Sequence, residues 1–213
     1  MNITWLGQAC FKIQGKDATI IIDPFDANIG LKVPRLAGDL LLITHDHNDH
    51  NNRKGVGGDP FIIDGPGEYE VRNVFVYGVP GFHDTKQGSD TGVVTMYAIE
   101  FEGLTVAHLG DIGTPELTPK QLEKLEDVDI LMIPIGGVYT VDAKGAAKII
   151  SQIEPRIVIP MHYYIPGLKT PKRLETEDAF RREMGSKTEV IDTLRITKKD
   201  IPQEETRVIF LKP

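Results

Sequence analysis

The stretch Ile43-Thr44-His45-Asp46-His47-Asn48-Asp49-His50-Asn51 contains three histidines and an aspartate at the spacing H-x-H-x-D-H. It overlaps the end of Leu40–Thr44, an apolar run typical of a buried strand. A loop at the end of a strand can direct alternate side chains into one pocket, as metal binding requires. Neutral imidazole and carboxylate groups are good ligands for Zn²⁺ and also bind Mn²⁺ or Fe. The stretch therefore predicts a metal site, and the alternative is a polar surface loop.

Composition limits the class of protein. The chain has 213 residues with 24 Lys plus Arg and 31 Asp plus Glu, a formal charge of −7, and we interpret residues 1–213 as one globular domain. The acidic balance argues against nucleic acid binding by a general basic surface, but leaves open a local basic mouth. The lone Cys10 excludes a disulfide framework and a thiolate zinc cluster, and fits a reducing compartment. Without a signal-peptide pattern or a long apolar stretch, we expect a cytoplasmic protein that does not enter a membrane.

Most of the chain is expected to form short strands, because apolar and β-branched runs alternate with turn residues. The expected strands are Ile3–Leu6, Ala9–Ile13, Ala18–Asp23, Leu40–Thr44, Phe61–Asp64, Glu68–Val71, Val74–Val79, Val93–Phe101, Leu104–Leu109, Asp129–Pro134, Arg156–Pro160, Thr188–Ile191 and Arg207–Leu211.

Three helices are expected, all in the second half of the chain. The first is capped by Thr118 and has Pro119 at its first position. The second spans Asp142–Ile153, and the third spans Thr176–Met184 and ends at Gly185. Many strands with few helices indicate an α+β protein in which stacked sheets are covered outside by helices.

Five segments together resemble the motifs of the metallo-β-lactamase-fold hydrolases, in the same order along the chain. The string His45–His50 is similar to the signature of that family. The others are Thr19-Ile20-Ile21-Ile22-Asp23-Pro24, Gly81-Phe82-His83-Asp84, His108-Leu109-Gly110-Asp111 and Pro160-Met161-His162-Tyr163. The resemblance runs from Trp5-Leu6-Gly7 to His162. Within the family the chain is most similar to the small branch that includes ascorbate-6-phosphate lactonase. The segment Pro134-Ile135-Gly136-Gly137, which precedes a helix, also resembles that branch. The resemblance implies a four-layer αββα sandwich.

The resemblance also implies two divalent metal ions, Zn²⁺ as the first choice and Mn²⁺ or Fe as alternatives. It implies His45, His47 and His83 on the first ion. It implies Asp49, His50 and His162 on the second, with Asp111 between the two. A hydroxide shared by two such ions can attack a carbonyl carbon or a phosphorus. We therefore expect Asp49, His50 and Asp111 to be needed for turnover.

Two buried-type polar residues are weaker candidates. Asp23 is expected to hydrogen-bond a metal-binding imidazole and fix its tautomer, and the alternative is a turn cap before Pro24. His108 lies within a strand, three residues before Asp111, so alternation directs the two to opposite faces. A packed or supporting histidine is therefore favoured over a ligand.

Several loop residues could contact a substrate. Gly137, in the segment Gly136–Thr140, could hold an anion through backbone N–H groups, but we favour a glycine turn with Thr140 as a helix cap. Tyr139 and Tyr163 are candidate pocket walls or ordinary packing. Thr85–Thr91 is a polar loop beside His83 that could contact a substrate or have no role. A basic group could line the mouth of the site, although a solvated loop is favoured; its members are Lys169, Lys172 and Arg173.

These observations favour a hydrolase of a small ester, lactone or phosphodiester, with an anionic small molecule as one candidate substrate. A nuclease or RNA-processing enzyme is an alternative, but the roughly 50 residues after His162 leave little room for a domain that clamps nucleic acid. A non-catalytic metal-binding protein is the other alternative, which the complete ligand set argues against. The sequence carries no sign of the oligomeric state.

Overall fold

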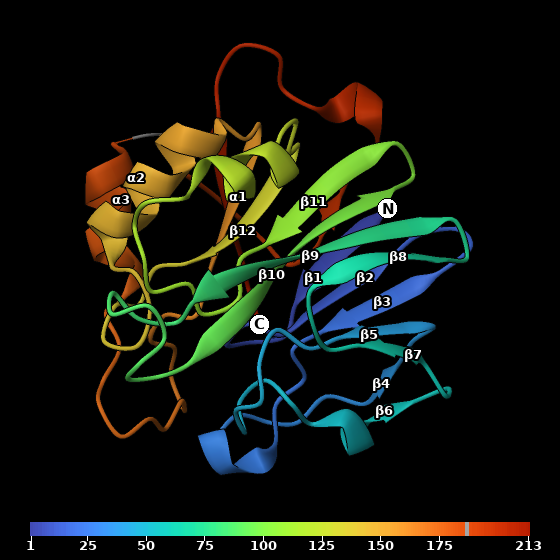
Figure 1. The fold of residues 1–213 in the computed structure, drawn as a ribbon, viewed down its shortest axis with the longest axis horizontal. Helices are drawn as coiled ribbons and strands as arrows, with labels where there is room; N and C mark the ends of the chain where they lie inside the picture. The colour runs from blue at the N-terminus through green and yellow to red at the C-terminus, as the bar shows by residue number, and fades with distance from the viewer. Residues whose placement is uncertain (186–187) are drawn as a thin grey trace.

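A computed structural model describes residues 1–185 and 188–213, which form two large sheets. The six-stranded sheet has the order β15 (Leu194–Arg195), β1 (Asn2–Trp5), β2 (Phe11–Gln14), β3 (Thr19–Ile22), β5 (Leu40–Leu42) and β7 (Phe61–Ile63). The eight-stranded sheet has the order β14 (Thr188–Ile191), β16 (Arg207–Leu211), β13 (Ile157–Met161), β12 (Ile130–Pro134), β11 (Leu104–His108), β10 (Val93–Phe101), β9 (Val74–Phe82) and β8 (Gly67–Val71). Figure 1 shows the two sheets packed face to face.

The hydrophobic core lies between the sheets. In β1 and β2 alternate residues are buried, so that Ile3, Trp5, Phe11 and Ile13 share one face. By contrast, every residue of β12 and of β13 is buried. These two strands are parallel neighbours covered on both faces, which explains their continuous apolar sequences.

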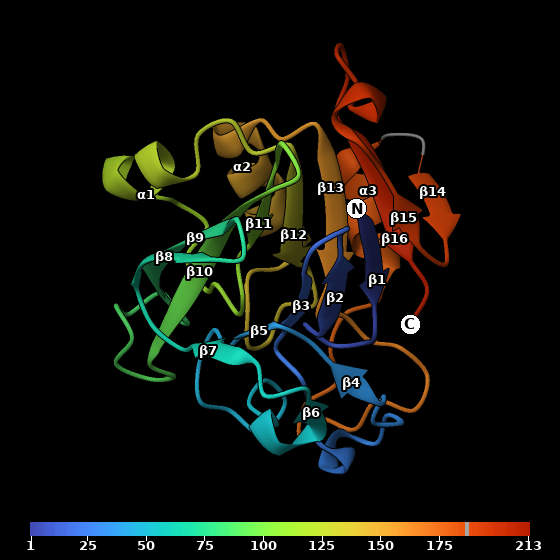
Figure 2. The same cartoon turned by 90° about the vertical axis from the view of Figure 1, so that its right-hand side faces the viewer.

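Three helices cover the outer face of the eight-stranded sheet: α1 (Pro119–Lys124), α2 (Ala143–Ile153) and α3 (Glu177–Met184). Figure 2 shows α1 beside β9, α2 beside β11 and β12, and α3 beside β13 and β16. The expected capping box forms at α1, where Thr118 accepts from the backbone N–H of Gln121. The expected stop of α3 is also confirmed, because Gly185 adopts a left-handed conformation with φ of 57°.

The outer face of the six-stranded sheet is covered differently. Its buried residues Ile21, Leu41 and Ile43 pack with Leu36 and Val56, which belong to a short ladder of β4 (Leu36–Ala37) and β6 (Val56–Gly57). Short 3₁₀ helices at Ala27–Ile29 and Arg53–Gly55 accompany this ladder. The α+β sandwich expected from the sequence is confirmed, and its α-helices within residues 1–185 and 188–213 belong to the larger sheet.

Strand boundaries differ from expectation where they matter for the site. Residues 6–10 form a tight turn in which Leu6 N donates to Cys10 O and Cys10 N donates to Gly7 O, so β2 begins at Phe11 and not at Ala9. The strand expected to end at Val79 continues to Phe82. The two-residue strands β4, β6 and β15 were not expected, because so short a run has no periodicity. No helix in the described part of the chain is long and apolar enough to cross a membrane.

Candidate metal centre

Strand ends bring the candidate ligands to one edge of the sandwich. Strands β11, β12 and β13 are parallel, and β9 runs in the same direction because both β9 and β11 are antiparallel to β10. His83 follows β9, Asp111 comes three residues after β11, and His162 follows β13. In the other sheet β3 and β5 are parallel, so Asp23 and the loop that starts at Ile43 also leave at one common edge.

Asp111 lies at the middle of the cluster. Its Oδ2 is 3.2 Å from Nε2 of His162, 3.3 Å from Nε2 of His50, 3.4 Å from Nε2 of His83 and 3.9 Å from Nε2 of His45. Four imidazoles from three different segments thus direct the same ring nitrogen at one carboxylate oxygen.

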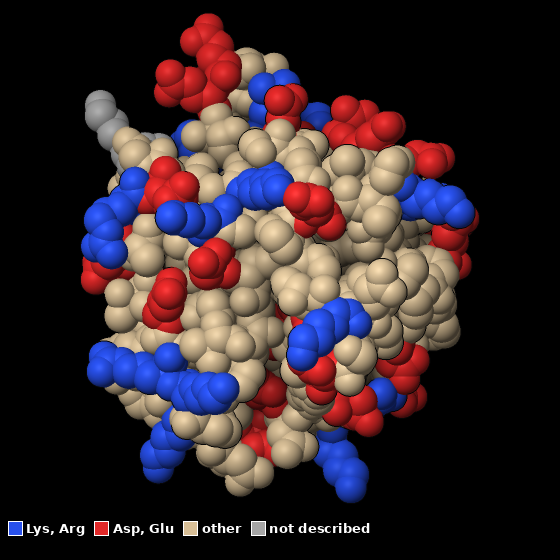
Figure 3. All heavy atoms as spheres, turned by 60° about the vertical axis from the view of Figure 1, so that its left-hand side comes forward, with Lys and Arg blue, Asp and Glu red and all other residues tan. Residues whose placement is uncertain are grey.

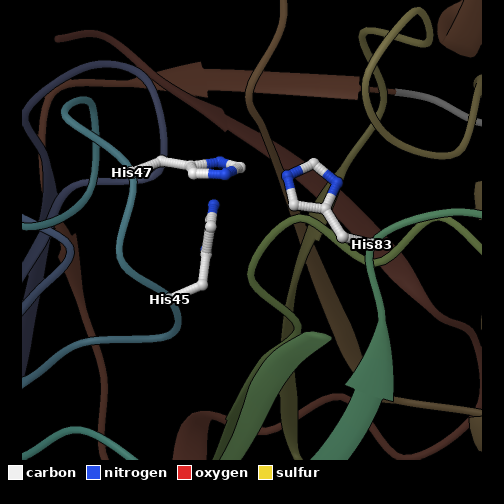
Figure 4. Close-up of side chains that lie close together, drawn as sticks. All are labelled: His45, His47 and His83. Carbon is white, nitrogen blue, oxygen red and sulfur yellow. The ribbon is translucent and has the colours of Figure 1, made fainter. Parts of the chain in front are cut away.

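The remaining two candidates flank this centre. The ring of His47 lies 4.4 Å from that of His45 and 5.2 Å from that of His83, measured between centroids. Figure 4 shows these three rings converging, with His45 and His47 on one loop and His83 at the end of β9. On the other side Asp49 Oδ2 lies 3.4 Å from Nε2 of His50.

The arrangement fits a metal ion. Three overlapping groups each place their donor atoms within 4.8 Å of one another: His45, His47 and His83; His45, His50 and Asp111; and Asp49, His50 and His162. All seven expected ligands belong to these groups. Buried polar atoms normally have a partner, yet Nε2 of His45, Nε2 of His50 and Oδ1 of Asp111 have no hydrogen-bond partner in the described part of the chain. A cation would satisfy such atoms.

One sequence comparison decides the family. The family model described as "Beta-lactamase superfamily domain" matches residues 2–162. The chain belongs to the metallo-β-lactamase superfamily. A UPF0173 metal-dependent hydrolase from Thermococcus onnurineus is 32% identical over 90% of this chain and 95% of its own length. The relatives carry the name metal-dependent hydrolase, so membership places the chain among the metal-dependent hydrolases of this superfamily.

Solved structures confirm the fold. The crystal structure of a candidate Zn-dependent hydrolase of the superfamily from Thermotoga maritima aligns with a TM-score of 0.82 and 34% identity over 99% of this chain and 98% of that chain. A metallo hydrolase from Ignicoccus hospitalis aligns with a TM-score of 0.63 and 23% identity over 86% of this chain and 90% of that chain. The second likeness shows the fold alone.

The buried carboxylate of Asp23 fixes the tautomers of two imidazoles, directly for His50 and through Thr44 for His45. Asp23 is fully buried and accepts from the backbone N–H of Thr44 (2.8 Å), from the Thr44 hydroxyl (2.6 Å) and from Nδ1 of His50 (2.9 Å). Because the hydroxyl donates its hydrogen to Asp23, Thr44 Oγ1 accepts from Nδ1 of His45 at 2.9 Å. Both rings thereby hold a proton on Nδ1 and present the lone pair of Nε2 to the centre.

Electrostatics couple the cluster. Burial lowers the pKa of His45 to about 3, and the adjacent ring of His50 adds to this effect. Burial also opposes a charge on His50 and His162, yet the carboxylate of Asp111 raises the pKa of both, that of His162 to about 9. The same two imidazolium groups hold the pKa of Asp111 well below its usual range despite its burial. Metal binding must therefore release protons from this cluster.

His108 and Tyr163 lie outside the ligand groups. His108 is fully buried, donates from Nε2 to Ala9 O at 2.9 Å and accepts at Nδ1 from Gly110 N at 3.2 Å. It thus fastens the turn before Asp111 to the first hairpin, in line with the packed role favoured from the sequence. The ring of Tyr163 is buried and stacks on Trp5 at 5.1 Å, so it packs in the core and is not a pocket wall.

The glycine segment before α2 is a turn. Gly137 donates its N–H to Val141 O and is therefore not free to bind an anion through that group. The expected helix cap at Thr140 is wrong: Asp142 occupies the N-cap and accepts from Gly145 N at 2.8 Å. An aspartate placed before the first helical turn outcompetes the threonine two residues upstream because its carboxylate also complements the helix dipole.

A pocket of about 520 Å³ opens onto the ligand cluster. Its walls beyond the cluster are Asn28, Ile29, Asn48, Thr91, Tyr139, Lys169, Thr170 and Pro171. Lys169 is exposed and lies on the rim of this pocket, where its backbone N–H donates to Ile29 O at 2.7 Å, so both interpretations drawn from the sequence stay open. Lys172 is outside the lining, and Arg173 stacks on the ring of Tyr164 at 4.4 Å.

The loop beside His83 is organised by the next residue. Asp84 accepts hydrogen bonds from the backbone N–H groups of Lys86, Gly88, Asp90 and Thr91. These bonds hold the pKa of its carboxyl group below its usual range. Thr91 reaches the pocket from this loop.

Gln8 is a site residue that no sequence pattern indicated. It is 1% exposed, and its Nε2 lies 2.8 Å from Asp49 Oδ2 and 2.9 Å from Nε2 of His162. The only hint in the sequence is a glutamine flanked by Gly7, Ala9 and Cys10 in a turn of otherwise small residues.

Proposed function

We propose that the chain is a dinuclear hydrolase that cleaves a small ester, lactone or phosphodiester. The observation that supports it is the placement of Asp111, whose Oδ2 lies within 3.9 Å of four imidazole nitrogens belonging to two neighbouring ligand sets. A carboxylate in that position can contact two ions at once.

The ligand assignment follows the three groups of donor atoms. His45, His47 and His83 would hold the first ion, and Asp49, His50 and His162 would hold the second. Zn²⁺ is the first choice for this all-nitrogen and oxygen donor set, with Mn²⁺ and Fe as alternatives. Two divalent ions held there would lower the pKa of a bound water to about 7 and would neutralise charge that develops on the attacked group.

The cysteine thiol does not supply a competing nucleophile. Cys10 is fully buried, and burial raises its pKa above the ordinary value, so it stays a neutral thiol. The protein's role is instead to position the metal ligands. Asp23 fixes the tautomer of His50, and Thr44 fixes that of His45. His47, which is exposed, and Asp49 line the pocket and so face an incoming substrate.

The pocket supports a small, anionic substrate. Its volume of about 520 Å³ suits a small molecule, and Ile29, Tyr139 and Pro171 supply apolar walls. Lys169 supplies a positive charge at the rim that could pair with a phosphate or carboxylate. Figure 3 shows Lys and Arg side chains interspersed with Asp and Glu over the face it draws, an arrangement that does not favour nucleic acid.

We also propose that residues 1–213 form one domain and that the protein is cytoplasmic. One cluster of buried hydrophobic residues includes both sheets, which supports treating residues 1–213 as one domain. The single, fully buried cysteine supports a cytoplasmic location.

Elemental analysis of the purified protein, compared with Asp111→Ala, tests the metal count. We expect about two ions per chain in the wild type and fewer in the variant. Asp129→Ala is the matched control, because Asp129 is also buried but accepts from Lys198 and Thr105 far from the cluster. One ion or none in the wild type would contradict the dinuclear assignment.

Activity separates the enzyme from a metal-binding protein. With metal supplied, the wild type should hydrolyse a chromogenic phosphodiester or a lactone, and Asp49→Ala should not. Full metal content with no hydrolysis across phosphodiesters, phosphomonoesters, esters and lactones would favour the non-catalytic alternative.

A further inference from the structure

The turn between β1 and β2 delivers a buried glutamine to one half of the metal centre. Gln8 has a φ of 54°, a left-handed conformation that glutamine rarely adopts. Its main-chain carbonyl oxygen accepts from Nε1 of Trp5 at 2.8 Å and from the backbone N–H of His162 at 3.0 Å. These two bonds hold the unusual backbone in place and so fix the direction of the side chain.

The side chain ends between two candidate ligands. Its Nε2 donates to Asp49 Oδ2 at 2.8 Å and lies 2.9 Å from Nε2 of His162. The side-chain oxygen, Oε1, is buried and has no hydrogen-bond partner in residues 1–185 and 188–213. A buried amide that leaves one end unpaired at a ligand cluster is a costly placement, which points to a role beyond packing.

We propose that Gln8 is a positioning residue of the second metal site, formed by Asp49, His50 and His162, and that it sets the affinity of that site. This inference rests on the proposed dinuclear function. The side-chain N–H donates to Oδ2 of Asp49, the oxygen that lies 3.4 Å from Nε2 of His50 and 3.9 Å from Nε2 of His162, and so orients this carboxylate toward the other two ligands. The main-chain carbonyl oxygen of Gln8 accepts from the backbone N–H of His162. Gln8 therefore restrains two of the three ligands.

The effect should be confined to the second site. Within the described residues, the hydrogen bonds of the Gln8 side chain involve Asp49 and His162, and none involves His45, His47 or His83. Loss of a group that orients a metal ligand typically lowers metal affinity by about 10–100-fold. We therefore expect a loss of that size for one ion and no change for the other.

The test is a zinc titration of chelator-stripped protein in competition with a chromophoric chelator, with elemental analysis after dialysis. Gln8→Met keeps the length of the side chain and removes its N–H donors. The expected result is two ions in the wild type, and in the variant one ion bound as before and a second bound about 10–100-fold more weakly. Gln152→Met is the matched control, because the side chain of Gln152 is likewise hydrogen-bonded, here to Leu117 N and Pro115 O, but lies outside the pocket lining.

The outcomes distinguish this inference from the proposed function. Two ions of unchanged affinity in Gln8→Met would overturn the inference and leave the dinuclear function standing. One ion or none in the wild type would overturn both. An equal loss in Gln152→Met would assign the effect to general destabilisation and overturn the inference. If Gln8→Met does not fold, Gln8→Gly, which suits the positive φ, gives the same decision.

Discussion

Replacing Asp23 by asparagine should weaken both metal sites at once. Oδ2 of Asp23 accepts two bonds, one from Nδ1 of His50 (2.9 Å) and one from the hydroxyl of Thr44 (2.6 Å) that in turn accepts from His45. Asparagine keeps the size of the side chain and tolerates the observed φ of 46°. Its amide nitrogen, however, can only donate where Oδ2 accepted.

The tautomer of His50 then reverses. If the asparagine oxygen keeps its bond to Thr44 N, the amide group faces Nδ1 of His50, which must give up its proton. That proton moves to Nε2, the atom that lies 3.4 Å from Asp49 and 3.3 Å from Asp111, and blocks it as a ligand. The hydroxyl oxygen of Thr44 must likewise accept from the asparagine amide. The hydroxyl hydrogen of Thr44 then points toward Nδ1 of His45.

The expected loss of metal-binding free energy at each site equals the contribution of one charge-assisted hydrogen bond. Such bonds contribute about 1.5–3 kcal/mol, which corresponds to roughly 10–100-fold in affinity and agrees with the usual effect of groups that orient metal ligands. Thr44→Val should separate the two sites, because it removes the connection to His45 but leaves Asp23 bonded to His50. In that variant only the site of His45, His47 and His83 should weaken.

Zinc titration against a competing chelator measures both affinities, and ¹⁵N NMR of the imidazoles reports the tautomers directly. Asp129→Asn is the control, since it changes a buried carboxylate outside the cluster in the same way. Unchanged zinc affinity in Asp23→Asn, or a His50 ring that keeps its proton on Nδ1, would refute the reasoning.

Three further perturbations test separate parts of the structure. Metal-free protein should lose about 1–3 kcal/mol of stability as the pH rises from 6.5 through about 9. The reason is that the pKa of His162 is raised to about 9 in the folded protein, so this ring stabilises the fold only while it is protonated. Urea unfolding at several pH values should show the decrease, and His162→Gln should make it smaller. Asp84→Ala removes the acceptor for four backbone N–H groups, so limited proteolysis should cut residues 85–91 faster while zinc content stays the same. Lys169→Ala should weaken inhibition by inorganic phosphate about 1.5–5-fold at low salt, whereas Lys172→Ala, outside the pocket lining, should not.

Most of the candidate site could be predicted because its ligands lie in compact local patterns. Four of them fall within the six residues His45–His50, and the other three, which the resemblance to the superfamily implied, each follow a strand. Parallel strands then bring these ends to one edge without any further information. Asp23 was also within reach, since it ends the strand that runs parallel beside Leu40–Leu42.

Gln8 could not be found in this way, and for Lys169 the sequence left open whether it lines the mouth of the site or belongs to a solvated loop. The Gln8 contact with His162 joins residues 154 positions apart and depends on a left-handed backbone that the sequence does not announce. Lys169 reaches the pocket only because its backbone bonds to Ile29, in a loop from the other half of the chain. The cover of the six-stranded sheet by β4 and β6 was missed for a related reason: two-residue strands carry no periodic pattern.

The ligand loop after β5 has no helix or sheet of its own between Ile43 and Asn52, so neighbouring elements supply much of its order. Three elements supply it. Thr95 of β10 donates its N–H to Thr44 O at 2.8 Å, and the hydroxyl of Tyr97 donates to Ile43 O at 2.7 Å, which fastens the start of the loop to the opposite sheet. Asp23 then holds Thr44 and His50 from β3, and Gln8 holds Asp49 from the first turn. Because these supports come from both sheets, the spacing of the two candidate metal sites is set by the packing of the sandwich itself, and a substitution that shifts one sheet against the other should disturb both sites even where it touches no ligand.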